Sequence, residues 1–399
     1  MNHLTSKTSS MKAMVLSDIA KLELREVPRP VVQEHEVLVR VSAVGLCGTD
    51  FHIFSGQSNY NINQRGKMIP LAQQPQILGH ELVGMVEEVG SLVKDLHIGD
   101  SFAAARSADR VVIDQGLNCL SRRRQPKCEY CTSGDSHQCQ FYSEYGITGL
   151  AGGLAEYIAV PAVNAIPINS DLETIAAVLT EPLGCISHAL DRVTRERTRY
   201  VINAEDSDKR VRSILIFGAG PAGLLFIQYL YKVLNYDGLI LVSEPNQRKR
   251  ELASYFGAEV IDPQVFDLAE VVQEKTNGRR VECLIDACGA GSVFTRFPAL
   301  IRKQATVLLY GLGHAGVDLS VLNNLQFIEP TLVTAIGASG GFRSDGRSHT
   351  YDRALGLLVA KQIEVSSWIT HCYQSLESVP QAFTRDHLEP DYIKGVVVL

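Results

Sequence analysis

Two places in the first half of the chain combine side chains that bind metal ions. The first comprises Cys47, within Gly45-Leu-Cys-Gly-Thr-Asp-Phe-His52, and the pair His80 and Glu81 further along. Thiolate, imidazole and carboxylate are ligands of zinc, and three protein ligands with a fourth position open are typical of a catalytic site. Taken singly, each side chain has a structural alternative: a buried cysteine, a core histidine or a solvated glutamate. As a group they predict a catalytic zinc site.

The second place is a run of cysteines. Cys128 and Cys131 have the C-x2-C spacing of a zinc knuckle, Cys139 follows, and Cys119 lies upstream. Four thiolates make a closed structural zinc site. An iron–sulfur cluster and unrelated free thiols are the alternatives. We predict a structural zinc here.

A glycine motif in the second half has the form that binds dinucleotides. The apolar run Ile214–Phe217 leads into Gly218-Ala-Gly220-Pro-Ala-Gly223, and an apolar helical pattern follows. Gly218 allows a tight turn, Gly220 lets the backbone approach a pyrophosphate, and Gly223 lets helix and strand pack closely. The first N–H groups of the helix then face the pyrophosphate. A glycine turn in an unrelated α/β protein is the structural alternative.

An acidic residue after the next apolar run indicates which cofactor binds. Leu239–Val242 is followed by Glu244, about 20 residues past the last glycine, as the motif requires. A carboxylate there accepts a hydrogen bond from the adenosine ribose and repels a 2′-phosphate, so NAD is predicted rather than NADP. Arg248, in the basic run that continues to Arg250, argues the other way, because an arginine can receive that phosphate.

The elements that position these motifs differ between the two halves. Short alternating runs before about Val160 predict strands of an irregular β-barrel: Lys12–Leu16, Glu36–Val44, Leu82–Val89, Arg110–Ile113 and Ala155–Val160. A helix is expected over Leu172–Leu190. Strand and helix patterns then alternate, which predicts a doubly wound parallel sheet. Its six strands are Ser213–Phe217, Leu239–Val242, Glu259–Ile261, Val281–Asp286, Ala305–Tyr310 and Thr331–Ile336.

The bulk properties exclude several classes of protein. The chain has 399 residues, 45% of them hydrophobic, which is enough for two globular domains. A net charge of −6 disfavours nucleic acid and anionic membranes as partners. No apolar run approaches the ~18 residues of a membrane span, and the start of the chain does not resemble a signal peptide. We therefore expect a cytoplasmic protein whose nine cysteines are thiols or metal ligands.

Taken together, these motifs resemble the zinc-containing medium-chain dehydrogenases, the family of alcohol, sorbitol, threonine and glucose dehydrogenases. The matching segments occur in the order of that family: Cys47–His52, Gly79–Glu81, the cysteine run, Gly152–Tyr157, Glu181–Gly184 and the glycine motif. The resemblance implies an α/β fold with a GroES-like irregular β-barrel domain and a Rossmann domain. The expected barrel domain is discontinuous, with residues 11–185 and 337–399, the Rossmann domain spans 186–336, and residues 1–10 form a disordered lead-in. A homodimer or homotetramer is also implied.

Three segments depart from the pattern of the family. A polar insertion lies around Ser55–Gln74, and Ser101–Ala108 reads as an extra segment. In the cysteine run, the family usually has its first cysteine two residues before the second, but Gln125 occupies that position. Cys119 must therefore serve across a spacer that contains Arg122-Arg-Arg124. The arginine run reads as a solvated loop.

The resemblance also assigns roles near the catalytic metal. It places Glu181 at the metal, as in the polyol, threonine and glucose dehydrogenase branches, although a helix-capping glutamate is the structural alternative. Thr49 would accept the proton of the alcohol and His52 would pass it on. Asp50 would hold the other ring nitrogen of His80.

The function expected from these features is zinc-dependent hydride transfer between a polyhydroxylated secondary alcohol and NAD. A polyol, sugar or cyclitol is favoured over an aliphatic alcohol because of Glu181 and the polar insertion. Threonine oxidation is the leading alternative substrate reaction. The retained zinc ligands disfavour two further classes of protein, a non-catalytic nucleotide-binding relative and a zinc-free quinone reductase.

Overall fold

The computed structural model describes residues 9–97 and 109–399, which form two compact units. Unit 1 comprises the chain up to Glu181 together with Ser339–Val359 and Val365–Leu399; unit 2 comprises Pro182–Ala338 and Ala360–Glu364. The expected extra segment Ser101–Ala108 and most of the expected lead-in lie outside the described residues. Ser10, assigned to that lead-in, already belongs to the first strand, because it pairs with Pro28.

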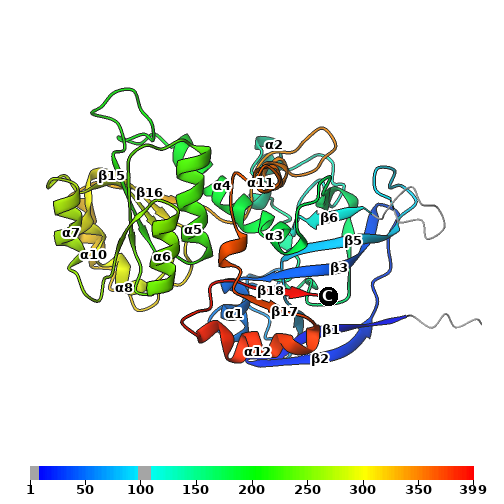
Figure 1. Cartoon of the computed structure of the whole chain (residues 1–399). Helices are drawn as coiled ribbons and strands as arrows, with labels where there is room; N and C mark the ends of the chain where they lie inside the picture. The colour runs from blue at the N-terminus through cyan, green and yellow to red at the C-terminus, as the bar shows by residue number, and fades with distance from the viewer. Residues whose placement is uncertain (1–8, 98–108) are drawn as a thin grey trace, which may run out of the picture. The chain divides into compact units, whose positions relative to one another are not determined.

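Unit 1 is built mainly from antiparallel strands, as the alternating runs predicted (Figure 1). Its main sheet has the order β10-β6-β5-β3-β18-β17, with β9 also paired to β3, and a smaller sheet has the order β2-β1-β4. The strands are β1 (Ser10–Asp18), β2 (Lys21–Pro28), β3 (Glu36–Leu46), β4 (Gln76–Ile77), β5 (Glu81–Val89), β6 (Arg110–Ile113), β7 (Gly116–Leu117), β8 (Ser143–Glu144), β9 (Tyr157–Pro161), β10 (Ala165–Pro167), β17 (His371–Tyr373) and β18 (Gly395–Val398).

The helices of unit 1 are short. They are α1 (Gly48–Phe54), α2 (Glu129–Ser133), α3 (Thr174–Ala177), α11 (His349–Val359) and α12 (Val379–Thr384). The strand β18 near the C-terminus pairs with β3, so the end of the chain completes the sheet that begins in the first fifty residues. This pairing brings residues far apart in the sequence to the end of β3.

Unit 2 is the predicted doubly wound sheet. Its six parallel strands have the order β13-β12-β11-β14-β15-β16, the order typical of dinucleotide-binding folds. In Figure 1, α5 and α6 lie on one side of this sheet, and α7 and α10 on the other. The elements are β11 (Ser213–Phe217), α5 (Pro221–Gln228), β12 (Leu239–Ser243), α6 (Gln247–Tyr255), β13 (Glu259–Ile261), α7 (Leu268–Lys275), β14 (Val281–Asp286), α8 (Gly291–Phe294), α9 (Phe297–Leu300), β15 (Ile301–Leu309), α10 (Val321–Gln326) and β16 (Thr331–Thr334), with a π-helical turn at Tyr229–Val233.

Two element predictions were wrong in detail. The single helix expected over Leu172–Leu190 is two helices, α3 and α4 (Thr180–Arg195). The helix is interrupted between them, and there the Thr180 hydroxyl donates to the carbonyl of Ala177 at 2.7 Å. Pro182 then lies in the first turn of α4, where a missing N–H costs little. Strand β15 begins at Ile301, before the predicted Ala305, and its pairing with β14 shifts register over the polar residues between.

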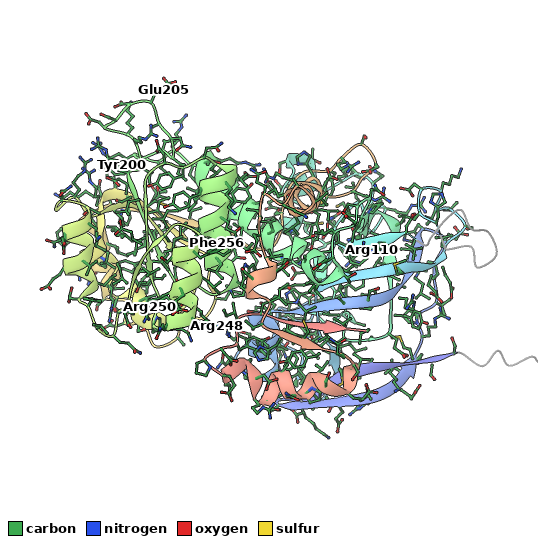
Figure 2. The ribbon with its side chains drawn as sticks, viewed as in Figure 1. Arg110, Tyr200, Glu205, Arg248, Arg250 and Phe256 are labelled. Carbon is green, nitrogen blue, oxygen red and sulfur yellow. The ribbon has the colours of Figure 1, made fainter. Side chains whose placement is uncertain are left out.

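An arm between α4 and β11, residues 196–212, was not predicted from the sequence. Figure 2 shows Tyr200 at its base and Glu205 at its tip. A single bridge pairs Val201 with Arg210, and Arg210 also binds Asp237 through both carboxylate oxygens, at 2.6 and 2.7 Å.

No helix among the described residues is both long enough and apolar enough to span a bilayer.

Candidate functional site

The end of β3 and the start of β5 bring the first metal-binding group together. These strands are antiparallel, and their register places Gly45 opposite Glu81. A Cβ atom at position 45 would lie 1.9 Å from the Oε2 of Glu81, so only glycine leaves room for that carboxylate. Cys47 follows directly, at the start of α1, where its backbone N–H donates to Asp50 Oδ2 at 2.9 Å. The cysteine and the His80-Glu81 pair thus converge because of strand pairing.

The ligand atoms of Cys47, His80 and Glu81 all lie within 4.8 Å of one another. His80 and Glu81 are buried. Glu81 Oε2 is a buried polar atom that has no hydrogen-bond partner among the described residues. Buried polar atoms are costly when unpaired. A thiolate, an imidazole and a carboxylate with a free oxygen therefore fit a zinc ion at this place.

The charges around His80 favour a cation. Asp50 is fully buried, and its Oδ1 lies 3.4 Å from His80 Nδ1 and accepts from the N–H of Gly79 at 3.1 Å. Burial alone would lower the pKa of His80, but Asp50 and Cys47 outweigh it and raise that pKa well above its usual value. A site that stabilises positive charge on an imidazole also stabilises a bound metal ion.

Lys394 is a member of this site that the sequence analysis missed. Its buried ammonium donates to Glu81 Oε1 at 2.6 Å and to the carbonyl of Leu46 at 2.9 Å. Burial would lower the pKa of Lys394, but Glu81 and then Cys47 raise it. One oxygen of Glu81 is thus held by lysine, and the other is left for a metal. A lysine directly before the apolar strand β18 was the available signal.

Replacing Lys394 by methionine is expected to destabilise unit 1 strongly. The substitution keeps the aliphatic stem but leaves the buried Glu81 without its partner, and breaking a buried ion pair costs about 3–5 kcal/mol of unfolding free energy. Denaturant titration measures this loss. The matched control is Lys12→Met, because Lys12 pairs with Glu377 at 3.0 Å on the exposed surface and should change stability very little. Equal losses in the two variants would contradict the assigned role.

The other residues assigned to this site lie on α1 or at the start of α4. Thr49 Oγ1 is 3.8 Å from Cys47 Sγ, and His52 is half-buried one turn further along α1. Among the described residues, no hydrogen bond joins Thr49 to His52. Glu181 is buried but is not a member of the metal-binding group. Its role as a ligand stays a prediction.

Glu181 is held by a residue that the sequence analysis did not single out. Gln115 donates from Nε2 to Glu181 Oε1 at 2.9 Å, and its Oε1 accepts from the hydroxyl of Tyr351 on α11. All three side chains are buried. The returning segment of unit 1 therefore fixes the orientation of Gln115 and, through it, of Glu181.

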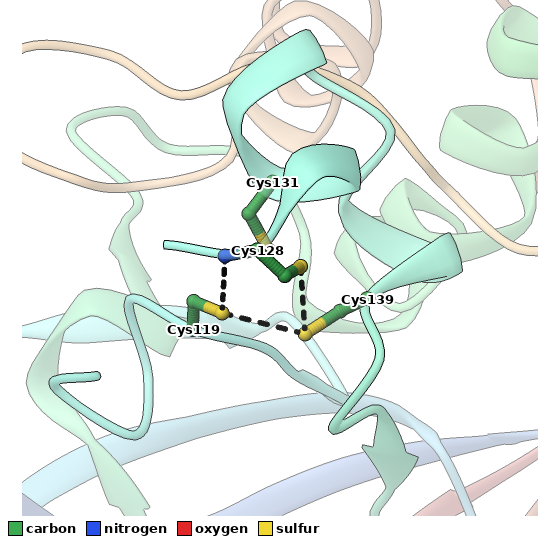
Figure 3. A group of neighbouring side chains, drawn as sticks. All are labelled: Cys119, Cys128, Cys131 and Cys139. Atoms are coloured by element: carbon green, nitrogen blue, oxygen red, sulfur yellow. Dashed lines mark hydrogen bonds between the residues drawn. The ribbon is translucent and has the colours of Figure 1, made fainter. Parts of the chain in front are cut away.

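The four cysteines of the second group come together around one point (Figure 3). The Sγ of Cys139 lies 3.7 Å from that of Cys119 and 3.8 Å from that of Cys128. A tetrahedron with zinc–sulfur bonds of about 2.3 Å has edges of about 3.8 Å. The N–H groups of Cys128 and Phe141 also donate to sulfur, each at 3.4 Å. This arrangement fits a closed zinc site and includes Cys119 despite the long spacer.

The arginine run in that spacer is not a simple solvated loop, although its side chains are exposed. The guanidinium of Arg124 lies 3.5 Å from the centroid of the Phe141 ring, and Arg122 donates to the carbonyl of Phe141 at 3.0 Å. Both arginines therefore contact Phe141, two residues after the last cysteine: Arg124 through the ring and Arg122 through the backbone. These contacts join the spacer after Cys119 to the segment that follows Cys139.

The polar insertion after α1 uses several of its own polar groups to fold. Ile62 pairs with Met68, Asn59 donates to the carbonyl of Ile69 at 2.9 Å, and Asn63 accepts two backbone N–H groups. Asparagine side chains commonly bind nearby backbone groups in this way and so stabilise turns. The insertion is therefore a small hairpin, and fewer of its polar groups remain for a substrate than the sequence suggested.

In unit 2, the three glycines have the geometry that a dinucleotide requires. Gly218 has a φ of 92°, a Cβ at Gly220 would meet no atom within 4 Å, and a Cβ at Gly223 would lie 2.1 Å from the Gly218 carbonyl. Gly220 therefore leaves open space above the start of α5, whereas Gly223 is required for close packing. These are the separate roles that the motif predicts.

Glu244 lies against the same turn. It is buried, its Oε2 accepts from the N–H of Ala219 and its Oε1 from that of Asn246, both at 2.8 Å. Two neighbouring arginines, Arg248 and Arg250, lie at the start of α6, where Figure 2 labels them. Arg250 folds back and binds Asp262 at 2.8 Å, whereas Arg248 is exposed. Arg248 is therefore the more accessible of the two.

Comparisons with known proteins find related proteins along most of the chain. The family model for the alcohol dehydrogenase GroES-like domain matches residues 33–170, and that for zinc-binding dehydrogenase matches residues 221–359. L-threonine 3-dehydrogenase of Pyrococcus abyssi is 31% identical over 364 residues, covering 90% of each chain. D-arabinitol dehydrogenase 1 of Uromyces fabae is 28% identical over 86% of this chain and 85% of its own. The crystal structure of galactitol-1-phosphate dehydrogenase from Escherichia coli shares the fold, with a TM-score of 0.75 at 21% identity, covering 98% of this chain and 100% of that one.

Proposed function

The chain belongs to the zinc-type medium-chain alcohol dehydrogenase family, and we propose that it transfers a hydride between a polyhydroxylated secondary alcohol and NAD. The observation that carries this proposal is the convergence of Cys47, His80 and Glu81 in one chain with the glycine motif and Glu244. The metal-binding group supplies the site for the alcohol oxygen, and unit 2 supplies the site for the cofactor. A non-catalytic relative would not require both the metal-binding group and the cofactor site.

In this mechanism each residue near the metal has a separate task. Cys47, His80 and Glu81 would hold zinc, whose Lewis acidity makes the alcohol proton easier to remove. Thr49, beside Cys47, would take that proton, and His52 on the same helix would pass it toward solvent. Asp50 keeps one ring nitrogen of His80 oriented, which leaves the other nitrogen for the metal.

The proposed substrate class rests on the presence of Glu181 and on relatives named for polyols. D-arabinitol dehydrogenase is named for a polyol. Glu181, which is buried and held by Gln115, looks like the glutamate of a polyol-type metal site. The second candidate is threonine, because a relative named for it is 31% identical to this chain. Both substrates are secondary alcohols with a polar neighbour next to the reacting carbon.

A substrate panel tests the proposed function. We expect kcat/KM with NAD to be highest for sorbitol, myo-inositol or glucose, lower for threonine, and lowest for 2-butanol. A pocket that hydrogen-bonds several hydroxyls rejects analogues without them by up to about 10⁴-fold. A preference for threonine would move the assignment to the second candidate. If 2-butanol equalled the polyhydroxy compounds, the proposed polyhydroxylated substrate class would be refuted.

The proposed cofactor is NAD in preference to NADP. A 2′-phosphate would have to lie beside the buried carboxylate of Glu244, and like charges in contact cost several kcal/mol. We expect kcat/KM to favour NAD by at least about 100-fold, and Glu244→Ser to reduce that preference. Arg248→Ala is the control and should leave the preference for NAD in place. A higher kcat/KM of the native enzyme with NADP would refute the assignment.

A homodimer or homotetramer is also proposed. The strand β16 ends the sheet of unit 2 among the described strands, and Leu332 on it is exposed, as are Leu319, Phe327 and Ile336 nearby. An exposed apolar edge strand is a site for pairing with another chain. Sedimentation equilibrium of the purified protein checks this, and a monomer at micromolar concentration would contradict it.

A further inference from the structure

The carboxyl end of β14 carries a carboxylate–histidine contact that has no task in the mechanism above. Asp286, the last residue of β14, is fully buried, and its Oδ2 lies 2.6 Å from Nε2 of His314. Its Oδ1 accepts from the backbone N–H of Cys288 at 3.1 Å and of Gly289 at 2.9 Å. Both oxygens of one buried carboxylate therefore bind loops that follow two different strands, β14 and β15.

The same two loops are joined through their backbones. The N–H of Gly311 donates to the carbonyl of Asp286 at 2.8 Å, and the N–H of His314 donates to the carbonyl of Gly289 at 2.6 Å. A Cβ at position 311 would lie 2.2 Å from the nitrogen of Gly289, so the loops touch with no side chain between them. The His314 side chain links the outer part of the second loop back to the buried carboxylate.

The position of these two loops, at the carboxyl ends of β14 and β15, relates them to the cofactor. In a doubly wound sheet the two halves of a dinucleotide bind on either side of the first strand, at the carboxyl ends. Glu244, the proposed partner of the adenosine ribose, follows β12 on one side of β11; β14 and β15 lie on the other. A Cβ at Gly218 would lie 3.2 Å from that of Cys288, so the β14 loop directly abuts the glycine motif.

We infer that Asp286 and His314 form a clamp that holds these two loops in the arrangement that receives the nicotinamide half of the cofactor. This inference rests on the proposed function, because it presupposes a dinucleotide. Asp286 and His314 are positioning residues, since they act on the loops rather than on the reacting atoms. A loop fixed in advance loses less conformational freedom on binding, which raises affinity. Without the clamp, the nicotinamide half must order the loop itself.

Calorimetric titration with NADH and with 5′-AMP tests the clamp, because AMP occupies only the adenosine side. His314→Asn is the disrupting variant: asparagine tolerates the φ of 44° at this position, but its side chain is too short to reach Asp286. We expect its Kd for NADH to rise about tenfold and its Kd for AMP to stay within about twofold. His314→Gln, whose amide can donate in place of Nε2, should restore NADH binding.

The matched control is His97→Asn, which removes an exposed histidine–aspartate pair of 3.2 Å in unit 1 and should change neither affinity. Unchanged NADH binding in His314→Asn would overturn the clamp. So would equal weakening of NADH and AMP, or failure of the variant to fold, because either result would assign the pair to general stability. A native protein that binds neither NADH nor NADPH would instead refute the proposed function.

Discussion

Replacing Cys47 by alanine is expected to lower kcat/KM by about 10³-fold or more while the protein stays folded. The proposed catalytic zinc loses its thiolate, and Lewis-acid stabilisation by a metal contributes several kcal/mol, where each ~1.4 kcal/mol is a factor of ten in rate. Cys47 lies at the start of α1 and is only partly buried, so its truncation opens little space in the core. Steady-state kinetics with the best substrate of the panel and NAD measures the loss.

The control for this variant is Cys372→Ala, which removes an exposed thiol of unit 1 outside both metal-binding groups. It should retain full activity and stability. If Cys47→Ala kept more than about a tenth of native kcat/KM, catalysis through a metal at this site would be refuted.

Replacing Cys131 by alanine is expected to have its main effect on stability. Its sulfur belongs to the buried group of four cysteines, and a structural zinc contributes its binding free energy to folding. We expect the melting temperature to fall by about 10 °C or more, because each ~1 kcal/mol corresponds to about 2–4 °C in a domain of 150–250 residues. The fraction of molecules that remains folded should retain turnover, since the catalytic group is separate.

The electrostatics of the cysteine group support this expectation. Hydrogen bonding from the backbone of Cys131 lowers the pKa of Cys128 to about 6, whereas burial raises the pKa values of Cys131 and Cys139. Four thiols whose sulfur atoms lie within 4.8 Å of one another become thiolates together only when a cation compensates their charge. Cys283→Ala, at a buried cysteine of β14 outside the group, is the matched control and should cost only the small cavity that it leaves. Equal melting temperatures for the two variants would contradict a structural metal.

The strands of unit 2 were predictable because its functional motif and its apolar runs are local patterns in the sequence. The glycine motif and the apolar runs of unit 2 predicted its strands, because each βαβ step has its own turn and periodicity. The long separation of Cys119 from Cys128 left Cys119 the least certain member of the cysteine group. In the structure the spacer between them contacts Phe141 through a hydrogen bond from Arg122 and through the Arg124 guanidinium over the ring. Cation–π packing of this kind has no periodicity that a sequence displays.

The partners of the site residues were not predictable for a different reason. Lys394, Gln115 and His314 each reach their partner through strand pairing or loop contact between segments distant in the sequence. Each one alone reads as an ordinary polar residue, and only the tertiary fold shows that it binds a buried carboxylate. The arm with Tyr200 was missed because polar residues there gave neither a strand nor a helix pattern.

The most direct test of two zinc sites with separate roles is the zinc content of three purified proteins, measured by elemental analysis. We expect two zinc ions per chain in the native protein and one in each of Cys47→Ala and Cys131→Ala. The remaining ion should be the structural one in the first variant and the catalytic one in the second, so that only the second turns over substrate. One zinc or fewer in the native protein, or an active Cys47→Ala variant, would contradict the assignment.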